Sequence, residues 1–220
     1  MRILAIRGRN LASLAAPFEV NFAAGPLERA GLFAITGPTG AGKSTILDAL
    51  CLALYNKIPR LEGAGGGQVG RGGEAEALTA KDVRGIVRHG AVEASAEVDF
   101  LGRDGGHYRA TWTVRRAYRK ADGKLQDANW SLASLSPDQA LASGKVDTLA
   151  AIIDKTGLDY DQFRRSVLLA QNDFDAFLKA DAKDRAALLE QMTGTEIYSR
   201  LSVAAFERAK AEHLAWKALE

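Results

Sequence analysis

The sequence predicts an α/β fold, and three observations carry this prediction. Apolar and polar residues alternate over 18–22, which is the period of a half-buried strand. A continuous apolar run at 31–36 is typical of a strand that is buried on both faces. Leu and Ala then recur at helical spacing over 44–55, so that a strand, a glycine-rich loop and a helix follow one another.

The other elements follow from the same two periods. Ile3, Leu4 and Ile6 predict a strand near the N-terminus. Between 94 and about 134, turn residues rich in Gly and Asp divide the chain into several short strands. Helices are expected in four further segments: 147–156, 159–169, a segment capped by Asp181 that ends at Gly194, and 195 to the C-terminus.

Composition is that of an ordinary globular protein. Of the 220 residues, 47% are hydrophobic and 25% are charged, and a net charge of +2 is too small to identify a partner. The single cysteine, Cys51, excludes an internal disulfide framework and indicates a reducing compartment. No apolar run approaches the ~20 residues that a membrane-spanning helix needs, and the N-terminal apolar stretch is too short for a signal peptide. We therefore expect a cytoplasmic protein with no membrane partner.

A complete phosphate-binding motif follows the apolar run. It reads G-x-x-x-x-G-K-[ST], and with the next threonine its residues are Gly37, Pro38, Thr39, Gly40, Ala41, Gly42, Lys43, Ser44 and Thr45. The glycines let backbone N–H groups point into one concave nest, and the following helix adds its positive N-terminal end. Lys43 is expected to neutralise the β- and γ-phosphates, and the Ser44 hydroxyl to bind Mg²⁺. The sequence therefore predicts a site for ATP and Mg²⁺ at this loop.

The acidic half of an ATPase site is missing from the pattern. Such a site needs an apolar strand that ends in a metal-binding carboxylate. Asp154 follows an apolar run, but Lys155 comes next and the neighbouring residues favour a helix. Asp99 ends no apolar run. On these residues alone, the chain is expected to bind ATP and not to hydrolyse it well.

Three stretches make the chain resemble the SbcC family, whose members are ATPase subunits of a bacterial exonuclease complex and are related to SMC and ABC ATPases. The stretches are 31–55, 156–178 and 183–198. The resemblance covers nearly the whole chain except the glycine-rich segment 63–76, which is expected to be a flexible loop. It implies an α/β, ABC-type P-loop ATPase N-terminal lobe over 1–200, with an antiparallel β subdomain and a helical Q-loop region, and the base of a coiled coil over 201–220.

The resemblance also implies roles for two residues outside the P-loop. Gln171 is then the Q-loop glutamine, a catalytic residue beside Lys43 and a Mg²⁺ ligand beside Ser44, at a junction of two subdomains. Ser13 lies in a segment that related ATPase heads bring over the nucleotide. We expect the Ser13 hydroxyl either to donate a hydrogen bond to the nucleotide or only to shape the turn. The signature motif and the acidic residues are expected in a C-terminal lobe of the same protein.

The same resemblance implies partners. These are the C-terminal lobe, a second head that closes on ATP to form a homodimer, an SbcD-type nuclease that this closure gates, and duplex DNA. Two alternatives stay open. One is an SMC- or RecF-like DNA-organising ATPase without a nuclease. The other is a P-loop kinase, which the unbroken final helix argues against.

Basic residues concentrate in the β-rich segment 92–135. Between 101 and 130, seven basic residues stand against three acidic ones, which is the footprint expected of contact with DNA phosphates. Arg109, Thr111 and Thr113 should share one face of a strand, opposite Trp112. The alternative is a sheet edge that its charge keeps soluble. The residues expected to contact DNA are Arg109, Arg115, Arg116, Arg119 and Lys120.

Overall fold

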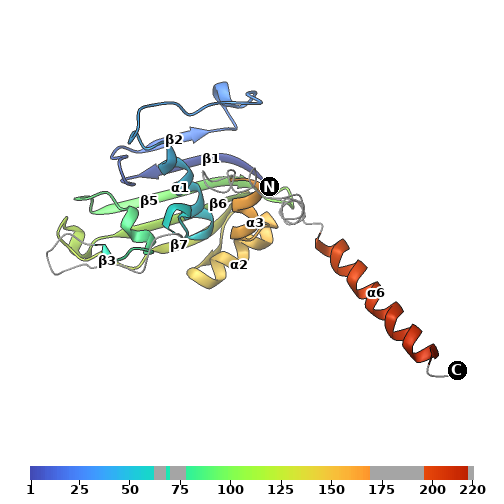
Figure 1. The fold of residues 1–220 in the computed structure, drawn as a ribbon. Helices are drawn as coiled ribbons and strands as arrows, with labels where there is room; N and C mark the ends of the chain where they lie inside the picture. Colours follow the sequence, from blue (N-terminus) through green and yellow to red (C-terminus); the bar gives the residue numbers. More distant parts are fainter. Residues whose placement is uncertain (62–67, 70–77, 169–195, 218–220) are drawn as a thin grey trace. The chain divides into compact units, whose positions relative to one another are not determined.

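The chain forms two compact units in the computed structural model, Met1–Leu158 and Asp159–Glu220 (Figure 1). The structure describes residues 1–61, 68–69, 78–168 and 196–217. The first unit contains the helices α1 (Lys43–Tyr55) and α2 (Lys145–Thr156) and the described strands. The second contains the helices α3 (Tyr160–Ser166) and α6 (Glu196–Lys217). Short 3₁₀ helices lie at Gly25–Leu27, Pro59–Leu61, Val83–Ile86 and Ala117–Arg119.

A six-stranded sheet organises the first unit. Its strands lie in the order β2 (Phe18–Asn21), β1 (Arg2–Arg9), β5 (Glu93–Leu101), β6 (His107–Arg115), β7 (Asn129–Leu135) and β8 (Asp138–Ser143). Each neighbouring pair is antiparallel. A separate antiparallel pair joins β3 (Gln68–Val69) to β4 (Leu78–Thr79). The strands predicted at the N-terminus, at 18–22 and between 94 and 134 are confirmed.

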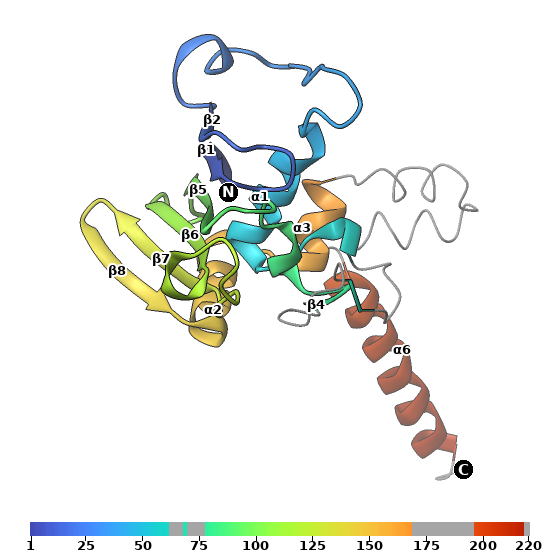
Figure 2. The same ribbon diagram turned by 90° about the vertical axis from the view of Figure 1, so that its left-hand side faces the viewer.

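The two helices of this unit pack on the sheet (Figure 2). Helix α1 contacts β1, β5 and β6, whereas α2 contacts β7 and β8. Alternate residues of the central strands are buried, and on β6 these include Trp112 and Val114. Arg109 and Thr111 point to the opposite face and are partly exposed, as the strand period predicted. The core therefore lies between the helices and one face of the sheet.

Helix α1 is the most deeply buried helix of the described chain. Its residues from Ala49 to Tyr55 are all buried, which fits their nearly continuous apolar character. The helix ends at Asn56, whose φ of 51° is left-handed and whose N–H donates to the Leu52 carbonyl. The helices predicted at 44–55, 147–156 and 159–169 are confirmed to within a few residues.

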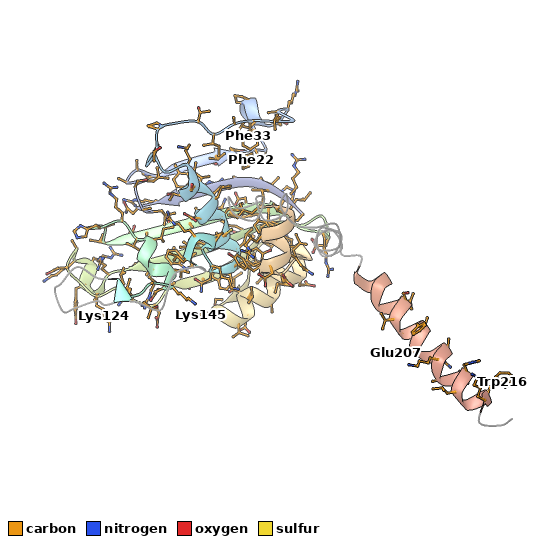
Figure 3. All side chains as sticks on the ribbon, in the orientation of Figure 1. Phe22, Phe33, Lys124, Lys145, Glu207 and Trp216 are labelled. Atoms are coloured by element: carbon orange, nitrogen blue, oxygen red, sulfur yellow. The ribbon has the colours of Figure 1, made fainter. Side chains whose placement is uncertain are left out.

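The strand predicted at 31–36 is wrong: the structure forms no strand there. Its large side chains are exposed, Leu32 by 93%, Phe33 by 46% and Ile35 by 42%. A strand needs a neighbour to accept and donate its backbone hydrogen bonds, and no described strand pairs with this run. Phe33 instead rests against Phe22, with 5.4 Å between the ring centroids (Figure 3).

Several predictions fall outside the described residues. They include the Q-loop residue Gln171, the helix capped by Asp181 and most of the loop 63–76, of which only Gln68 and Val69 are described. The last predicted helix is confirmed as α6, whereas its role as the base of a coiled coil stays a prediction. Among the described helices none combines the length and the apolar character that crossing a membrane requires.

Candidate nucleotide site

Three glycines give the P-loop its shape. Gly37, Gly40 and Gly42 have φ angles of 153°, 83° and 92°, a region that residues with a Cβ rarely adopt. The loop then runs directly into α1, which begins at Lys43. Every residue from Gly37 to Ala41 is exposed, so the loop stands open to a ligand. The loop and the helix of the predicted strand–loop–helix motif are therefore present, whereas its strand is not.

The backbone of this loop is arranged to receive an anion. Within the described part of the chain, the N–H groups of Gly40 and Gly42 have no hydrogen-bond partner. The first turn of α1 adds N–H groups that lack partners inside the helix, together with the positive end of the helix dipole. Triphosphate oxygens are the acceptors that such a nest fits. The residues present therefore suit the predicted nucleotide.

Lys43 is held over the same loop. Its ammonium donates hydrogen bonds of 2.8 Å to the carbonyls of Gly37 and of Pro38. These contacts fold the side chain back across the P-loop, where a phosphate would meet its charge. Ser44 is exposed at the first turn of α1, and Thr45 is buried with its N–H donating to the Gly42 carbonyl. A hydroxyl at Ser44 is therefore available to a metal ion on the phosphate side of the helix end.

The predicted nucleotide-binding residue Ser13 lies against this loop. A Cβ atom added at Gly42 would lie 2.6 Å from Leu14 Cδ2 and 3.0 Å from Ser13 Oγ. Only glycine fits this close approach of the segment 10–14 to the P-loop. The structure thus brings Ser13 together with Gly42 and Lys43, although they are about thirty residues apart in sequence. Whether Ser13 binds a nucleotide stays a prediction.

Arg88 is a residue of this region that the sequence patterns did not single out. Its Nη1 donates to the Ser13 carbonyl at 2.9 Å and to the Ala12 carbonyl at 3.4 Å. The segment around Arg88 follows a short 3₁₀ helix, and it carries neither a motif nor a period that indicates a binding residue. Its position became evident only from the tertiary fold.

Two tryptophans fix the C-terminal end of α1 to the sheet. Trp112 and Trp130 face each other across β6 and β7. Trp112 Nε1 donates to Asn56 Oδ1 at 2.9 Å, and Trp130 Nε1 donates to the Ala53 carbonyl at 2.7 Å. Both rings are buried, at 0% and 2% exposure. The sheet therefore holds the helix whose first turn carries the P-loop lysine.

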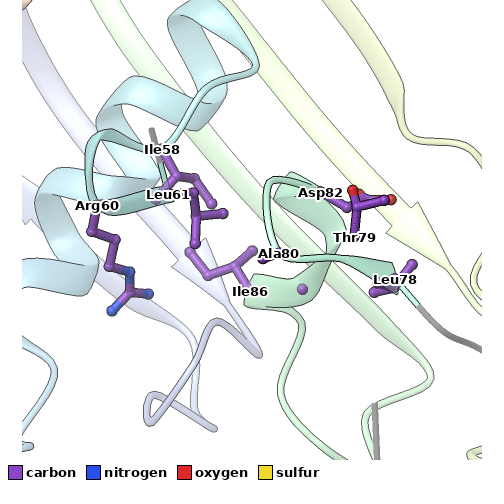
Figure 4. Close-up of a pocket in the computed structure, with 9 residues that line it drawn as sticks. Ile58, Arg60, Leu61, Leu78, Thr79, Ala80, Asp82 and Ile86 are labelled. Carbon is purple, nitrogen blue, oxygen red and sulfur yellow. The ribbon is translucent and has the colours of Figure 1, made fainter. Parts of the chain in front are cut away.

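Helix α1 also carries a buried carboxylate, Asp48. Asp48 is 4% exposed, and its Oδ2 lies 3.0 Å from Arg60 Nη2 in an ion pair without hydrogen-bond geometry. Burial raises the pKa of Asp48, and the nearby Arg60 charge partly offsets that effect. A cavity of about 350 Å³ opens beside Arg60, between Ile58 and Ile86 (Figure 4). No P-loop residue lines this cavity, so it is separate from the nucleotide site.

Asp154 and Asp99, which the sequence did not favour as metal ligands, form ion pairs with basic side chains. Asp154 lies in α2, with Arg103 at 3.3 Å and Lys155 at 3.2 Å. Asp99 is bound by arginines within the sheet. Among the described residues, no three His, Cys, Asp or Glu side chains are grouped as a metal site would require. The described part therefore contains the predicted phosphate-binding loop and no grouped carboxylates that would complete an ATPase site.

The residues predicted to contact DNA divide into two groups. Arg109 binds Asp99 through Nε at 2.6 Å and Nη2 at 2.9 Å. Arg116 donates to the carbonyls of Ala91 at 3.1 Å and Gly123 at 2.8 Å. These two arginines serve the fold, and that leaves fewer donors for a phosphate. The prediction that they contact DNA is not tested by this geometry.

The second group lies at or beyond the end of β6. Arg115 is exposed and 3.7 Å from Glu93, while Arg119 and Lys120 are exposed on the connection to β7. Tyr118 on the same connection is 92% exposed. Tyr118 and Arg119 have φ angles of 55° and 52°, which is a strained conformation for residues with a Cβ. This connection therefore displays an aromatic ring between basic side chains.

Known proteins are similar to this chain over nearly its whole length. The AAA domain family matches residues 5–217. The C subunit of nuclease SbcCD from Rhodobacter capsulatus is 52% identical over 216 residues, which make up 97% of this chain and 17% of that protein. The protein of the same name from Pseudomonas aeruginosa is 52% identical over 221 residues, or 100% of this chain and 18% of that protein.

A more distant relative carries a related name. The "Probable DNA double-strand break repair Rad50 ATPase" of Aquifex aeolicus is 30% identical over 178 residues, which are 81% of this chain and 15% of that protein. The chain thus spans about a sixth of the length of these relatives.

Proposed function

This chain belongs to the AAA domain family, and we propose that it is the ATP-binding lobe of an SbcC-type ATPase that acts with a nuclease in DNA double-strand break repair. The observation that carries the proposal is the open glycine loop at the start of α1, with Lys43 folded across it. The names of the relatives support a nuclease partner and make the alternative without one less favoured.

Each part of the loop would have one task in nucleotide binding. The N–H groups of Gly40 and Gly42 and of the first helical turn would donate to phosphate oxygens. Lys43 would exchange its carbonyl partners for the β- and γ-phosphates, and Ser44 would bind Mg²⁺. The metal ion, when bound, neutralises charge on the phosphates. Gln171, which lies outside the described residues, is proposed as the Q-loop glutamine and as a second Mg²⁺ ligand beside Ser44.

The C-terminal lobe of the same protein is the proposed neighbour of the segment 31–36. An exposed apolar run that leads into the P-loop suits a strand whose partner lies elsewhere in the protein. The lone chain is then nearly inactive as an ATPase, because its described part groups no carboxylates for a metal. Two such heads would close on ATP as a homodimer, and this closure would gate an SbcD-type nuclease.

The proposal is tested by ATP binding and ATP turnover. Purified chain should bind a fluorescent ATP analogue in the presence of Mg²⁺, and Lys43→Ala should abolish that binding, since the phosphates lose their nearest cation. Turnover should be close to background for the chain alone and should appear when the separately produced C-terminal lobe is added. Retained tight binding by Lys43→Ala would refute the phosphate assignment. Appreciable hydrolysis by the lone chain would refute the split site.

Duplex DNA is the proposed ligand of the connection between β6 and β7. Arg119 and Lys120 are two neighbouring exposed cations on this connection. Replacing both by Gln should lower the slope of log affinity against log salt by about 1.8, since each phosphate contact contributes about 0.9. Arg103→Gln, on the connection between β5 and β6, is the control because its guanidinium pairs with Asp154. An unchanged slope in the double variant of the full-length protein would rule this surface out.

A further inference from the structure

The segment that lies against the P-loop is a tightly built turn. Asn10 and Ala12 both have left-handed backbones, with φ angles of 55° and 46°. Leu11 and Leu14 exchange backbone hydrogen bonds of 3.1 Å and 2.8 Å, which closes the turn around Ala12 and Ser13. Leu11 is completely buried and anchors the turn to the core. Two strained residues in so short a segment persist only where the surroundings hold them.

Backbone hydrogen bonds from the segment 86–88 hold this turn in place. The Ala12 N–H donates to the Ile86 carbonyl at 2.7 Å, and the Arg88 N–H donates to the Asn10 carbonyl at 2.9 Å. A β-bridge joins Leu11 to Val87 between these two bonds. The turn at 10–14 and the segment 86–88 therefore form a small antiparallel pair outside the main sheet.

The side chain of Arg88 then reaches past this backbone pairing. Its Nη1 donates to the Ser13 carbonyl at 2.9 Å and more weakly to the Ala12 carbonyl at 3.4 Å. A charged donor makes such bonds stronger than a neutral one does. Arg88 thus holds the carbonyls of both residues at the tip of the turn, whereas the backbone pairing with 86–88 holds only the Ala12 N–H.

The tip of the turn is the part that contacts the P-loop. Ser13 Oγ and Leu14 would lie 3.0 Å and 2.6 Å from a Cβ at Gly42, the residue before Lys43. A shift of the tip by one ångström would therefore open or close the wall of the phosphate cradle at the start of α1. The bonds that Arg88 makes are among those that hold this wall in place.

We propose that Arg88 is a positioning residue of the nucleotide site. By holding the carbonyls of Ser13 and Ala12, it keeps the turn 10–14 against Gly42 and the Ser13 hydroxyl beside the triphosphate. The inference rests on the proposed function, because it names a further residue of the same site. Arg88 acts through the turn and is not assigned a bond to the nucleotide itself.

The test uses the full-length protein and the affinity for a fluorescent ATP analogue with Mg²⁺. Arg88→Ala should weaken binding about tenfold, the effect of losing a hydrogen bond from a charged donor. Arg88→Lys should restore most of the affinity, because an ammonium can reach the same carbonyls. Arg103→Ala is the matched control: it removes an arginine from an ion pair at the other end of β5 and should leave affinity within about twofold.

Urea unfolding of each variant separates positioning from stability. If Arg88→Ala lowers the unfolding midpoint but binds ATP within about twofold of the parent, the inference is overturned. It is also overturned if affinity is lost and Arg88→Lys does not recover it. Should Arg88→Ala fail to fold, Arg88→Met keeps the length of the side chain but has no donor, and affinity within twofold of the parent would again overturn the inference. Failure of the parent protein to bind the analogue, or tight binding by Lys43→Ala, would instead contradict the proposed function.

Discussion

Asp99 shows how a single residue can decide which arginines of the sheet are available to bind a ligand. It is 7% exposed, on the face of β5 opposite the helices. Arg109 donates to both of its oxygens, and Arg7 donates to Oδ2 at 2.7 Å. Burial alone would raise the pKa of Asp99, but the hydrogen bonds from Arg109 and Arg7 outweigh it and lower that pKa. Arg109 is consequently a weaker candidate for DNA contact than Arg119.

Asp99→Asn should destabilise the fold at neutral pH by about 2 kcal/mol, because two arginines lose their charged acceptor. A carboxylate whose pKa is lowered by folding stabilises the native state above its unfolded pKa, and that contribution is lost as the pH falls through the folded pKa. The difference in unfolding free energy between parent and variant should thus be constant at neutral pH and shrink below the ordinary pKa of 3.8.

Urea unfolding followed by circular dichroism at several pH values measures this difference. Asp154→Asn is the control, since its ion pairs are exposed and should contribute less than about 1 kcal/mol. A difference for Asp99→Asn that persists undiminished at the lowest pH would contradict the assigned role of the carboxylate.

At the scale of elements, the sheet positions the P-loop through the far end of α1. The cross-strand pair Trp112 and Trp130 donates to Asn56 and to the Ala53 carbonyl, at the last turn of the helix. Nothing in the period-two pattern of β6 and β7 predicted these bonds. The pattern indicates which side chains are buried, whereas the indole N–H partners depend on how the helix lies across the strands.

Trp130→Phe should lower the free energy of unfolding by about 2 kcal/mol, because the buried Ala53 carbonyl loses its donor and the smaller ring leaves space. Thermal or urea unfolding followed by circular dichroism checks this expectation. Trp216→Phe on α6 is the matched control, since that ring is 54% exposed, and should change stability by less than about 0.5 kcal/mol. Equal effects of the two substitutions would contradict the anchoring role.

For the whole molecule, the exposed run at 31–36 is the feature that most needs an explanation. Three large apolar side chains in one short segment are more than scattered surface hydrophobics, and they directly precede the P-loop. This chain spans about a sixth of the length of its relatives, so the relatives contain further segments that could cover such a run. We propose that the C-terminal lobe does so.

The double variant Leu32→Ser, Ile35→Ser should weaken association between this chain and the separately produced C-terminal lobe at least about tenfold, because apolar burial is lost from the contact. Titration calorimetry with the two polypeptides measures the affinity. Val146→Ser removes an apolar side chain that is 81% exposed at the start of α2 and should leave the affinity unchanged. Equal affinity of the double variant and the parent would show that another surface joins the lobes.

The sequence by itself predicted most of the described helices and strands and the glycine loop before α1. The P-loop follows from Gly37 to Thr45 alone, because glycine spacing and an adjacent helix suffice to form an anion nest. Strands such as β6 follow from alternation, since burial on one face needs only a period of two. These features are local, and local chemistry is visible in sequence.

Only the tertiary structure decided which residues far apart in the sequence contact one another. It set Ser13 against Gly42, tied Arg88 to the turn at 10–14 and withdrew Arg109 into a pair with Asp99. It also corrected the strand at 31–36, because an apolar run becomes a strand only where a neighbouring strand completes its hydrogen bonds. Contacts between residues far apart in the chain depend on the relative placement of whole elements, which no spacing within one segment records.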